Sequence, residues 1–187
     1  MWRTVLFCSL ILFGIATFIY ITLPPYEDLV DGRARGSVTF LDKNGNTFAW
    51  RGDQLGDIIT STSISPMLKN AIVATEDKRY YRHFGISPRG ILGAIKTNLK
   101  AGRGPLKGSG GSTITQQTAK LICLGKEYNP NKWESERQYE ADCRKITKTR
   151  KIKEAIFAVI MEFRYTKDEI LSLYLNRAYL AAGSRGF

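Results

Sequence analysis

Residues 74–86 read ATEDKRYYRHFGI and place two adjacent carboxylates, Glu76 and Asp77, at the expected end of a helix. Three basic residues, three aromatic residues and the only histidine of the chain follow them. If this helix starts at Pro66, Glu76 lies four residues after Ile72 and shares its apolar stripe. Removal of water disfavours the charged form of a carboxylate, so such a position would suit general acid or base chemistry. The alternative is a solvated helix end, in which Glu76 pairs with a neighbouring lysine or arginine. The predicted stripe consists of Met67, Leu68, Ala71, Ile72 and Thr75.

An uncharged apolar segment near the N-terminus, residues 5–23, predicts a membrane-spanning helix. A helix needs about 20 apolar residues to cross a bilayer, and this run is close to that length. It exceeds the apolar core of a signal peptide, and Leu-Pro-Pro stands where a cleavage site of small residues would follow. We therefore expect an uncleaved anchor over residues 1–25. The flanking charges determine its orientation only weakly, because Arg3 precedes the segment while Arg33 and Arg35 follow it.

The composition fits one folded domain with short appendages. Of the 187 residues, 43% are hydrophobic, so the chain can bury a core. Its 28 lysines and arginines against 17 acidic residues give a net charge of +11. This charge favours an anionic partner, which could be nucleic acid, anionic lipid or a phosphorylated substrate. Charge alone does not choose among them.

Between the anchor and the helical part, residues 26–63 are typical of a polar linker that contains one β-hairpin. The hairpin is predicted over residues 38–50, where VTFL and TFAW flank DKNGN. Asn44 and Gly45 would supply the positive backbone angles that a tight turn needs. Residues 64–187 are predicted to form a helical domain.

Start signals and apolar periodicity predict further helices in this domain. One begins at Ser87-Pro88, and the last begins at Thr166, where TKDE is a capping box, and ends near Asn176. A glycine-rich stretch, residues 101–111, lacks the spacing of a nucleotide-binding loop, so we expect a flexible flap there. The faces assigned to the core are Ile91, Leu92, Ile95 and Leu99 in the first helix, Ile152, Ile156, Val159, Ile160 and Phe163 in a long helix over residues 144–165, and Ile170, Leu171, Tyr174 and Leu175 in the last.

Another helix is predicted to follow the glycines, because Thr113 and Gln116 have the capping-box spacing. Thr113, Gln116, Gln117 and Lys120 would share one face of it. A glycine-rich approach to a helix N-terminus suits binding of sugar hydroxyls or an anion. The alternative is a capped surface helix. Its predicted buried side consists of Ile114, Leu121 and Ile122.

The long helix has a strongly basic first half that is followed by Glu154. Arg150 and Lys151 precede Glu154 by four and three residues, which places the three side chains on one face. A carboxylate beside fixed cations stays ionised, and the cations remain available to a diphosphate. The alternative is a solvated helix face whose internal ion pairs contribute only a few tenths of a kcal/mol each.

The three cysteines give no zinc-binding spacing. Cys8 lies in the predicted membrane span, and Cys123 and Cys143 lie in the helical domain. The latter two could form a disulfide, which an oxidising periplasm would favour, but two free thiols fit the sequence equally well.

Four stretches, in this order, resemble the peptidoglycan glycosyltransferase domain of class A penicillin-binding proteins and of monofunctional biosynthetic transglycosylases. The resemblance covers about residues 64–187. The first motif, E-D-x-x-F-x-x-H-x-G, is matched by Glu76, Asp77, Tyr80, His83 and Gly85, and the second, G-x-S-T-I-T-Q-Q, by Gly110, Ser112, Thr113, Ile114, Thr115, Gln116 and Gln117. The third, R-K-x-x-E, is matched by Arg150, Lys151 and Glu154, and the fourth, K-x-x-I-L-x-x-Y-L-N, by Lys167, Ile170, Leu171, Tyr174, Leu175 and Asn176.

The sequence departs from the family pattern at a few positions. Tyr80 replaces the usual phenylalanine, and Leu121 stands where an asparagine is common. The segment between Lys120 and Arg150 is longer than usual and contains two cysteines. A fifth, glycine-rich motif begins at Gly183, and the sequence stops within it.

The resemblance implies a mainly α, lysozyme-like fold and an inverting glycosyltransferase that polymerises lipid II and releases undecaprenyl diphosphate. It implies that Glu76 is the general base for the acceptor 4-hydroxyl and that Glu154 lies on the donor side, where it orients the diphosphate or a metal. Lys120, Arg150 and Lys151 would offset the charge on the leaving diphosphate. The other expected substrate-binding residues are Asp77, Ser112, Thr113, Gln116, Gln117 and Asn176, with Tyr80, His83 and Gly85 as structural support.

The resemblance also implies partners and a location. The expected partners are lipid II, the growing glycan strand and membrane lipid, but not nucleic acid. Other cell-wall synthesis proteins are a further possible class of partner. Lipid II exposes its sugars outside, so we expect a single-pass protein of the bacterial inner membrane with its domain on the periplasmic side. The sequence requires no cofactor. A divalent cation such as Mg²⁺ or Mn²⁺ is compatible with the chemistry, although no ligand cluster demands it.

Two alternatives remain open. A lytic glycan hydrolase is one, since paired carboxylates in a lysozyme-like fold also suit glycoside cleavage. The basic face before Glu154 disfavours it, because hydrolysis of a glycan releases no diphosphate. The other is an inactive membrane-anchored module that binds lipid II or a partner protein.

Overall fold

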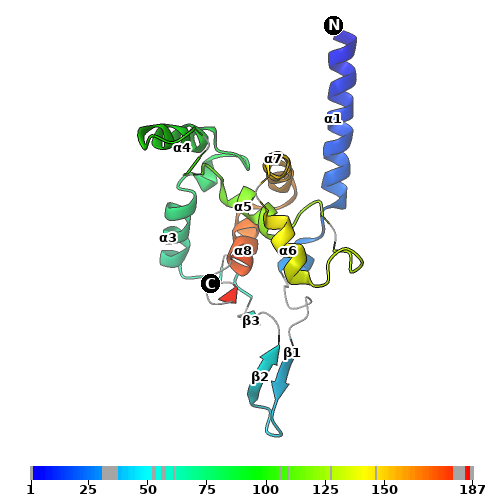
Figure 1. Ribbon diagram of the computed structural model, residues 1–187, viewed down its shortest axis with the longest axis vertical. Helices are drawn as coiled ribbons and strands as arrows, with labels where there is room; N and C mark the ends of the chain where they lie inside the picture. The colour runs from blue at the N-terminus through cyan, green and yellow to red at the C-terminus, as the bar shows by residue number, and fades with distance from the viewer. Residues whose placement is uncertain are drawn as a thin grey trace.

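Helices form most of the structure, as the sequence predicts (Figure 1). The computed structural model describes residues 2–30, 38–51, 54–55, 58–60, 62–105, 107–108, 110–126, 128–145, 147–178 and 184–185. The helices are α1 (Trp2–Thr22), α2 (Tyr26–Val30), α3 (Pro66–Glu76), α4 (Pro88–Lys100), α5 (Ile114–Leu121), α6 (Glu136–Arg144), α7 (Lys148–Arg164) and α8 (Lys167–Arg177), with a short 3-10 turn at Tyr80–Arg82. The strands are β1 (Val38–Leu41), β2 (Thr47–Arg51), β3 (Gln54–Leu55) and β4 (Ser184–Arg185).

Helix α1 extends from one end of the molecule, and the β1–β2 hairpin extends from the opposite end (Figure 1). Among the described residues, α1 is the one helix that is long and apolar enough to cross a membrane, and none of its residues is buried. The chain after α1 contacts the helical body, because the Tyr165 hydroxyl donates a hydrogen bond to the carbonyl oxygen of Pro24. The apolar helix of the predicted anchor is therefore present, while its membrane and its orientation remain predictions.

The core lies around α5, which packs against α7 and α8. Ile114 of α5, Met161 of α7 and Leu171 of α8 are fully buried. Burial of each such side chain contributes roughly 1.5–3 kcal/mol, so this three-helix contact is a principal source of stability. The predicted buried face of α8 is confirmed, and it consists of Ile170, Leu171, Tyr174 and Leu175.

Three helices begin at the side-chain caps that the sequence predicts. The Ser87 hydroxyl accepts a hydrogen bond from the first turn of α4. Thr113 with Gln116 forms a complete capping box at α5, and Thr166 with Glu169 forms another at α8. Each cap satisfies backbone N–H groups that have no partner within the helix, and so fixes where the helix begins.

The predicted hairpin is present as the antiparallel pair β1 and β2. Gly45 has a φ of +85°, which glycine adopts without steric cost. The prediction of a positive φ at Asn44 is wrong. Among the described residues, Cys123 is the only non-glycine residue with a positive φ. Instead, the Asp42 carboxylate accepts hydrogen bonds from the backbone nitrogens of Asn44 and Asn46, at 2.8 and 2.9 Å, and closes the turn.

Part of the predicted linker is packed against the helical body. Leu29 of α2 is buried, and its carbonyl oxygen accepts a hydrogen bond of 2.7 Å from the Arg177 guanidinium. Strand β3 also lies in the predicted linker, and it pairs in parallel with β4. Both contacts join residues that are far apart in the chain, so local patterns do not reveal them. The boundaries 1–25, 26–63 and 64–187 remain predictions.

The predicted core face of α4 is wrong. Leu92 and Leu99 are 66% and 57% exposed, and Ile91 is also exposed. Helix α4 lies at the periphery, away from the α5–α7–α8 core (Figure 1). The periodicity identified an amphipathic helix correctly, but it could not show whether another element covers the apolar face.

The predicted core stripe of α7 is largely wrong as well. Ile152 and Phe163 are 63% and 67% exposed, and Ile156 is exposed too, whereas Ile160 is buried as predicted. Besides Ile160, the buried face carries Glu154, Ala158 and Met161, which were not part of the predicted stripe. Helix α7 begins at Lys148 rather than at residue 144, because the Thr147 hydroxyl caps it. Packing against α5 selects the face that turns inward, and this face contains the carboxylate of the third motif.

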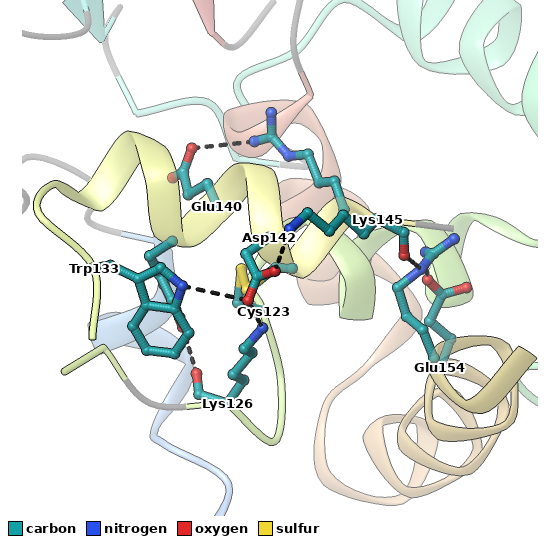
Figure 2. The surroundings of a disulfide bond; sticks show 11 residues. Cys123, Lys126, Trp133, Glu140, Asp142, Lys145 and Glu154 are labelled. Atoms are coloured by element: carbon teal, nitrogen blue, oxygen red, sulfur yellow. Dashed lines mark hydrogen bonds and ion pairs between the residues drawn. A yellow bond between two sulfur atoms is a disulfide. The ribbon is translucent and has the colours of Figure 1, made fainter. Parts of the chain in front are cut away.

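A disulfide between Cys123 and Cys143 joins the end of α5 to the last turn of α6, so this pairing is confirmed (Figure 2). The two Cα atoms are 5.7 Å apart. Trp133 and Tyr139 pack beside the cysteines, with ring centroids 5.1 Å apart, and form a second buried cluster. Cys8 is exposed on α1 and is free.

Candidate active site

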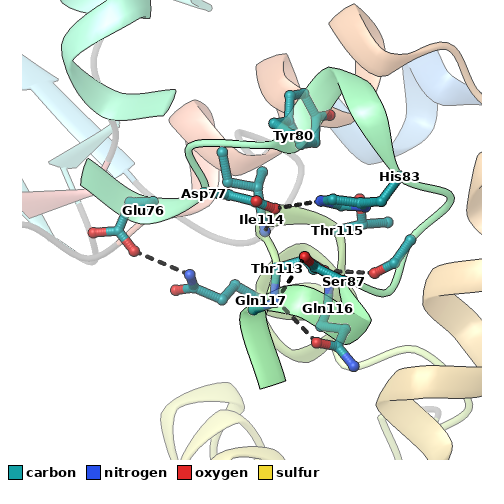
Figure 3. A network of polar contacts seen from close by, with 12 residues as sticks. Glu76, Asp77, Tyr80, His83, Ser87, Thr113, Ile114, Thr115, Gln116 and Gln117 are labelled. Carbon is teal, nitrogen blue, oxygen red and sulfur yellow. Dashed lines mark hydrogen bonds and ion pairs between the residues drawn. The ribbon is translucent and has the colours of Figure 1, made fainter. Parts of the chain in front are cut away.

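Glu76 lies at the C-terminal end of α3, where it faces Gln117 of α5 (Figure 3). The Gln117 Nε2 atom donates a hydrogen bond of 3.0 Å to Glu76 Oε2. The prediction of a water-poor setting is wrong, since Glu76 is exposed. Helix α3 buries Ile72 but leaves Met67 83% exposed, so the predicted apolar stripe is not covered. Glu76 is therefore an accessible carboxylate that a core helix orients.

Tyr174 of α8 is a second neighbour of Glu76, and the sequence assigned it only to the core. Burial, and then the nearby Glu76 carboxylate, together raise the pKa of Tyr174 to about 12. The phenol therefore stays neutral at physiological pH and can act as a hydrogen-bond donor beside Glu76. Its place in the Y-L-N part of the fourth motif was the signal that could have identified it.

Asp77 lies inside the protein and supports the site (Figure 3). Its Oδ2 atom is 2.9 Å from His83 Nε2 and accepts a hydrogen bond of 3.2 Å from the backbone nitrogen of Ile114. The carboxylate thus joins the end of α3, the turn after it and the N-terminus of α5. These contacts give Asp77 a supporting role together with His83, and its predicted contact with substrate stays a prediction.

Tyr80 and Gly85 also support the turn, as predicted. The buried Tyr80 hydroxyl donates a hydrogen bond of 2.6 Å to the carbonyl oxygen of Lys167. Gly85 has a φ of +73°, and a Cβ atom there would lie 2.5 Å from the carbonyl oxygen of Ala158. The turn therefore approaches α7 so closely that glycine is required.

Thr113 and Gln116 do not lie on an open binding face. The Thr113 hydroxyl donates to the carbonyl oxygen of Gly85, and Gln116 Oε1 accepts from the Thr113 backbone nitrogen at 3.0 Å. Both side chains are buried, because α5 is covered by neighbouring helices on most sides. Their predicted role in substrate binding stays a prediction. What the contacts show is that both side chains fix the N-terminus of α5.

Glu154 lies on the buried face of α7, between Arg150 and Lys151. Its carboxylate is paired with the Arg150 guanidinium, and Lys151 Nζ is 2.8 Å from its Oε2 atom. Lys151 Nζ also donates a hydrogen bond of 3.0 Å to the hydroxyl of Ser112. The predicted alignment of these three charged residues is confirmed, and Ser112 joins them.

Lys120 connects the two parts of the site electrostatically. Burial lowers the pKa of Lys120, and the positive charges of Arg150 and Arg144 lower it further, while Glu76 partly opposes them. The pKa of Lys151 is lowered for related reasons, by burial first and then by Arg150 and Lys120. Closely spaced cations of this kind are relieved when an anion binds among them.

A pocket of about 340 Å³ opens beside this cluster, between the end of α5, the last turn of α6 and the start of α7. Its wall includes Glu154, Phe157 and both cysteines of the disulfide. The basic residues that line it are Lys120, Lys126, Lys145, Arg150 and Lys153. This pocket is suited to a polyphosphorylated or otherwise anionic group.

The side-chain amide of Asn176 is engaged by backbone groups of its own chain. Its Oδ1 atom accepts from the backbone nitrogen of Ile59 at 2.9 Å, and its Nδ2 atom donates to the carbonyl oxygens of Ile59 and Ser172, at 2.6 and 2.7 Å. These contacts use the amide to attach the segment before α3 to α8. The contacts show a structural role, and the predicted binding role stays a prediction.

The described residues contain no group of three or more histidine, cysteine or acidic side chains that could hold a metal ion. The Glu154 carboxylate is already engaged by Arg150 and Lys151. The described residues therefore offer no dedicated divalent-cation site, and the use of Mg²⁺ or Mn²⁺ stays a prediction.

Comparison with known proteins gives one family. The family model described as transglycosylase matches residues 44–187. The chain is 34% identical to a penicillin-binding protein 1A/1B of Bacillus subtilis over 193 residues, which covers 100% of this chain and 19% of that protein. It is 35% identical to penicillin-binding protein 1A of Aquifex aeolicus, over 92% of this chain and 21% of that protein. It is 34% identical to penicillin-binding protein 1A of Escherichia coli, over 94% of this chain and 18% of that protein. The chain thus spans about a fifth of the length of these relatives.

Proposed function

Because the chain belongs to the transglycosylase family, we propose that it carries a peptidoglycan glycosyltransferase centre that polymerises lipid II and releases undecaprenyl diphosphate. The observation that carries the proposal is the combination of an accessible, oriented carboxylate, Glu76, with a cation-lined pocket beside Glu154. A glycosyl transfer that releases a diphosphate needs a base for the acceptor hydroxyl and cations for the leaving group.

On the acceptor side, Glu76 takes the proton of the 4-hydroxyl as that oxygen attacks the donor sugar. Its exposure gives a sugar access to the carboxylate, and Gln117 limits the directions in which the carboxylate can point. Tyr174 remains protonated beside it and donates to the carboxylate or to the bound sugar. Orientation of a reacting group in this way lowers the entropic part of the barrier.

On the donor side, Lys120, Arg150 and Lys151 offset the charge that grows on the leaving diphosphate. Glu154 keeps the two α7 cations in place, because it pairs with both of them. Ser112 contacts Lys151 and offers its hydroxyl to a phosphate or sugar oxygen. These groups are positioned before substrate arrives, so little reorganisation is needed during the reaction.

The same features favour transfer over the two alternatives. A glycan hydrolase has no diphosphate to release and would leave the basic pocket without a role. A binding module without turnover would not need an oriented carboxylate next to a neutral phenol. The apolar α1 helix supports a membrane-anchored enzyme. Its proposed substrate would require the domain to lie on the side where lipid II exposes its sugars.

Labelled lipid II tests the proposal directly. The full chain in detergent micelles is incubated with lipid II, and products are separated by size. The proposal predicts glycan polymer and free undecaprenyl diphosphate. Shortening of preformed glycan strands would favour a hydrolase, and saturable binding without any new product would favour the inactive module.

A further inference from the structure

The Cys123–Cys143 disulfide forms part of the wall of the basic pocket (Figure 2). Cys123 lies just beyond the end of α5, and Cys143 lies in the last turn of α6. The bond therefore closes the polar segment that separates the second and third motifs and brings the end of α6 against α5. Both cysteines are buried within the protein yet border the pocket.

Helix α6 is held by the disulfide together with hydrogen bonds, since the Tyr139 hydroxyl donates to the carbonyl oxygen of Lys126 and the Trp133 indole N–H donates to Asp142 at 3.3 Å. Its main packing partner is α5, and its buried cluster comprises the two cysteines, Trp133 and Tyr139, apart from the main core. Asp142 adds ion pairs with Lys126 and with Lys145, the latter at 3.0 Å. The Asp142 side chain is about a quarter exposed, so water screens these pairs, and exposed pairs contribute little. The disulfide is the covalent link of this small cluster, and it ties the end of α6 to the residue just beyond α5.

The backbone carbonyl of Lys145, at the end of α6, contacts the charged cluster. Lys145 follows Cys143 by two residues, and its carbonyl oxygen accepts a hydrogen bond of 2.7 Å from Arg150 Nε. The Nη1 atom of the same guanidinium is paired with Glu154 (Figure 2). A planar guanidinium that is bound at both Nε and Nη1 has its orientation fixed. The disulfide is thus two residues away from a group that sets the direction of Arg150.

On the basis of the proposed diphosphate-releasing function, we propose that the Cys123–Cys143 disulfide positions Arg150 through the Lys145 carbonyl and thereby makes the diphosphate affinity of the basic pocket depend on the oxidation state of the two cysteines. In the oxidised chain, Arg150 is held beside Glu154 and faces the pocket. In the reduced chain, the α6–α7 connection is released, and Arg150 loses its fixed direction.

The redox step is an ordinary thiol–disulfide exchange. A dithiol reductant supplies two electrons and two protons, the sulfur–sulfur bond breaks, Cys123 and Cys143 become thiols, and the reductant closes to its own cyclic disulfide. Cys8 is the third cysteine of the chain and is free, so a Cys8→Ser background removes it from the experiment.

The test uses the full chain with Cys8→Ser in detergent micelles and titrates inorganic pyrophosphate by calorimetry before and after treatment with dithiothreitol. We expect binding to weaken about tenfold on reduction, the scale of a lost hydrogen bond to a charged group. The Cys123→Ser/Cys143→Ser variant should show the weaker affinity with or without reductant.

Two pocket variants separate positioning from general loosening. Arg150→Ala should bind pyrophosphate weakly in both oxidation states, because the group on which the disulfide acts is gone. Lys153→Ala removes a pocket cation that has no contact with the Lys145 carbonyl among the described interactions, so reduction should still weaken its binding about tenfold.

Equal pyrophosphate affinity of the oxidised and reduced chains would overturn the inference. A full effect of reduction on pyrophosphate affinity in Arg150→Ala would also overturn it. Circular dichroism that shows the reduced chain to be unfolded would do the same, since either result would show that the disulfide is merely structural. Redox-dependent pyrophosphate binding in a chain that makes no polymer from lipid II would support the inference and reject the proposed function.

Discussion

The side-chain amide of Gln117 donates a hydrogen bond of 3.0 Å to the carboxylate of Glu76. Gln117 belongs to α5, the helix around which the core is built, whereas Glu76 is exposed at the end of α3. A rigid element therefore orients a carboxylate that substrate can reach.

Gln117→Ala should lower kcat for lipid II polymerisation about tenfold, because a hydrogen bond to a charged group contributes roughly 1.5–3 kcal/mol. The thermal midpoint should change little, since the Gln117 side chain is only partly buried. Gln138→Ala on α6 is the matched control, and its exposed side chain should leave kcat unchanged. An unaltered kcat in Gln117→Ala would show that the amide does not orient Glu76.

Gly85→Ala should destabilise the protein much more than Gly45→Ala. Both glycines have positive φ, which costs another residue about 1–2 kcal/mol. A Cβ atom at Gly85 would lie 2.5 Å from the Ala158 carbonyl oxygen, whereas one at Gly45 would meet nothing within 4 Å. Urea unfolding should therefore show a loss of about 3 kcal/mol or more for Gly85→Ala and about 1 kcal/mol for Gly45→Ala. Similar losses would contradict the close approach of the turn to α7.

Asn176→Ala should reduce stability and leave the KM for lipid II unchanged. The side chain makes three hydrogen bonds to the backbone of Ile59 and Ser172, and their loss should cost roughly 1–3 kcal/mol. Denaturant unfolding and steady-state kinetics on the same preparation measure the two effects. A raised KM with unchanged stability would restore Asn176 to the substrate-binding set.

Lys120 should set the alkaline limit of the reaction. Burial lowers its pKa, and Arg150 and Arg144 lower it further, so the ammonium loses its charge at a lower pH than an ordinary lysine. Since the charged form is the one that offsets the diphosphate, kcat/KM should fall as the pH rises through that pKa. Arginine keeps its charge over this range, so Lys120→Arg should extend activity to higher pH. An identical alkaline limb in Lys120→Arg would exclude Lys120 as its cause.

The local signals in the sequence were sufficient to locate helices and motifs. The capping boxes at Thr113 and Thr166 fixed two helix starts, and the spacing of Arg150 and Glu154 placed them together. Such signals act within one or two turns, so they survive in any tertiary context. The disulfide was one of two equal alternatives, because spacing alone does not show whether two cysteines meet in space.

The remaining errors concern which face of a helix is covered. Ile152 and Phe163 of α7 are apolar but exposed, whereas Glu154 is buried among cations on the opposite stripe. Hydrophobic periodicity shows which residues share a helix face, but not which elements pack against that face. An amide such as that of Asn176 can bind backbone groups as well as substrate, and its residue type does not tell which. Glu76 is accessible because α3 is sparsely packed. The sequence of α3 does not indicate how much of the helix other elements cover.

The most direct test of the account is the rate at which Glu76→Gln converts lipid II to polymer. Glutamine keeps the size of the side chain but cannot take the proton of the acceptor hydroxyl. A positioned general base contributes roughly a hundredfold to ten-thousandfold, so the rate should fall at least about a hundredfold while pyrophosphate binding stays unchanged. Polymerisation by Glu76→Gln at a rate close to that of the unaltered chain would contradict the assignment of Glu76 as the base.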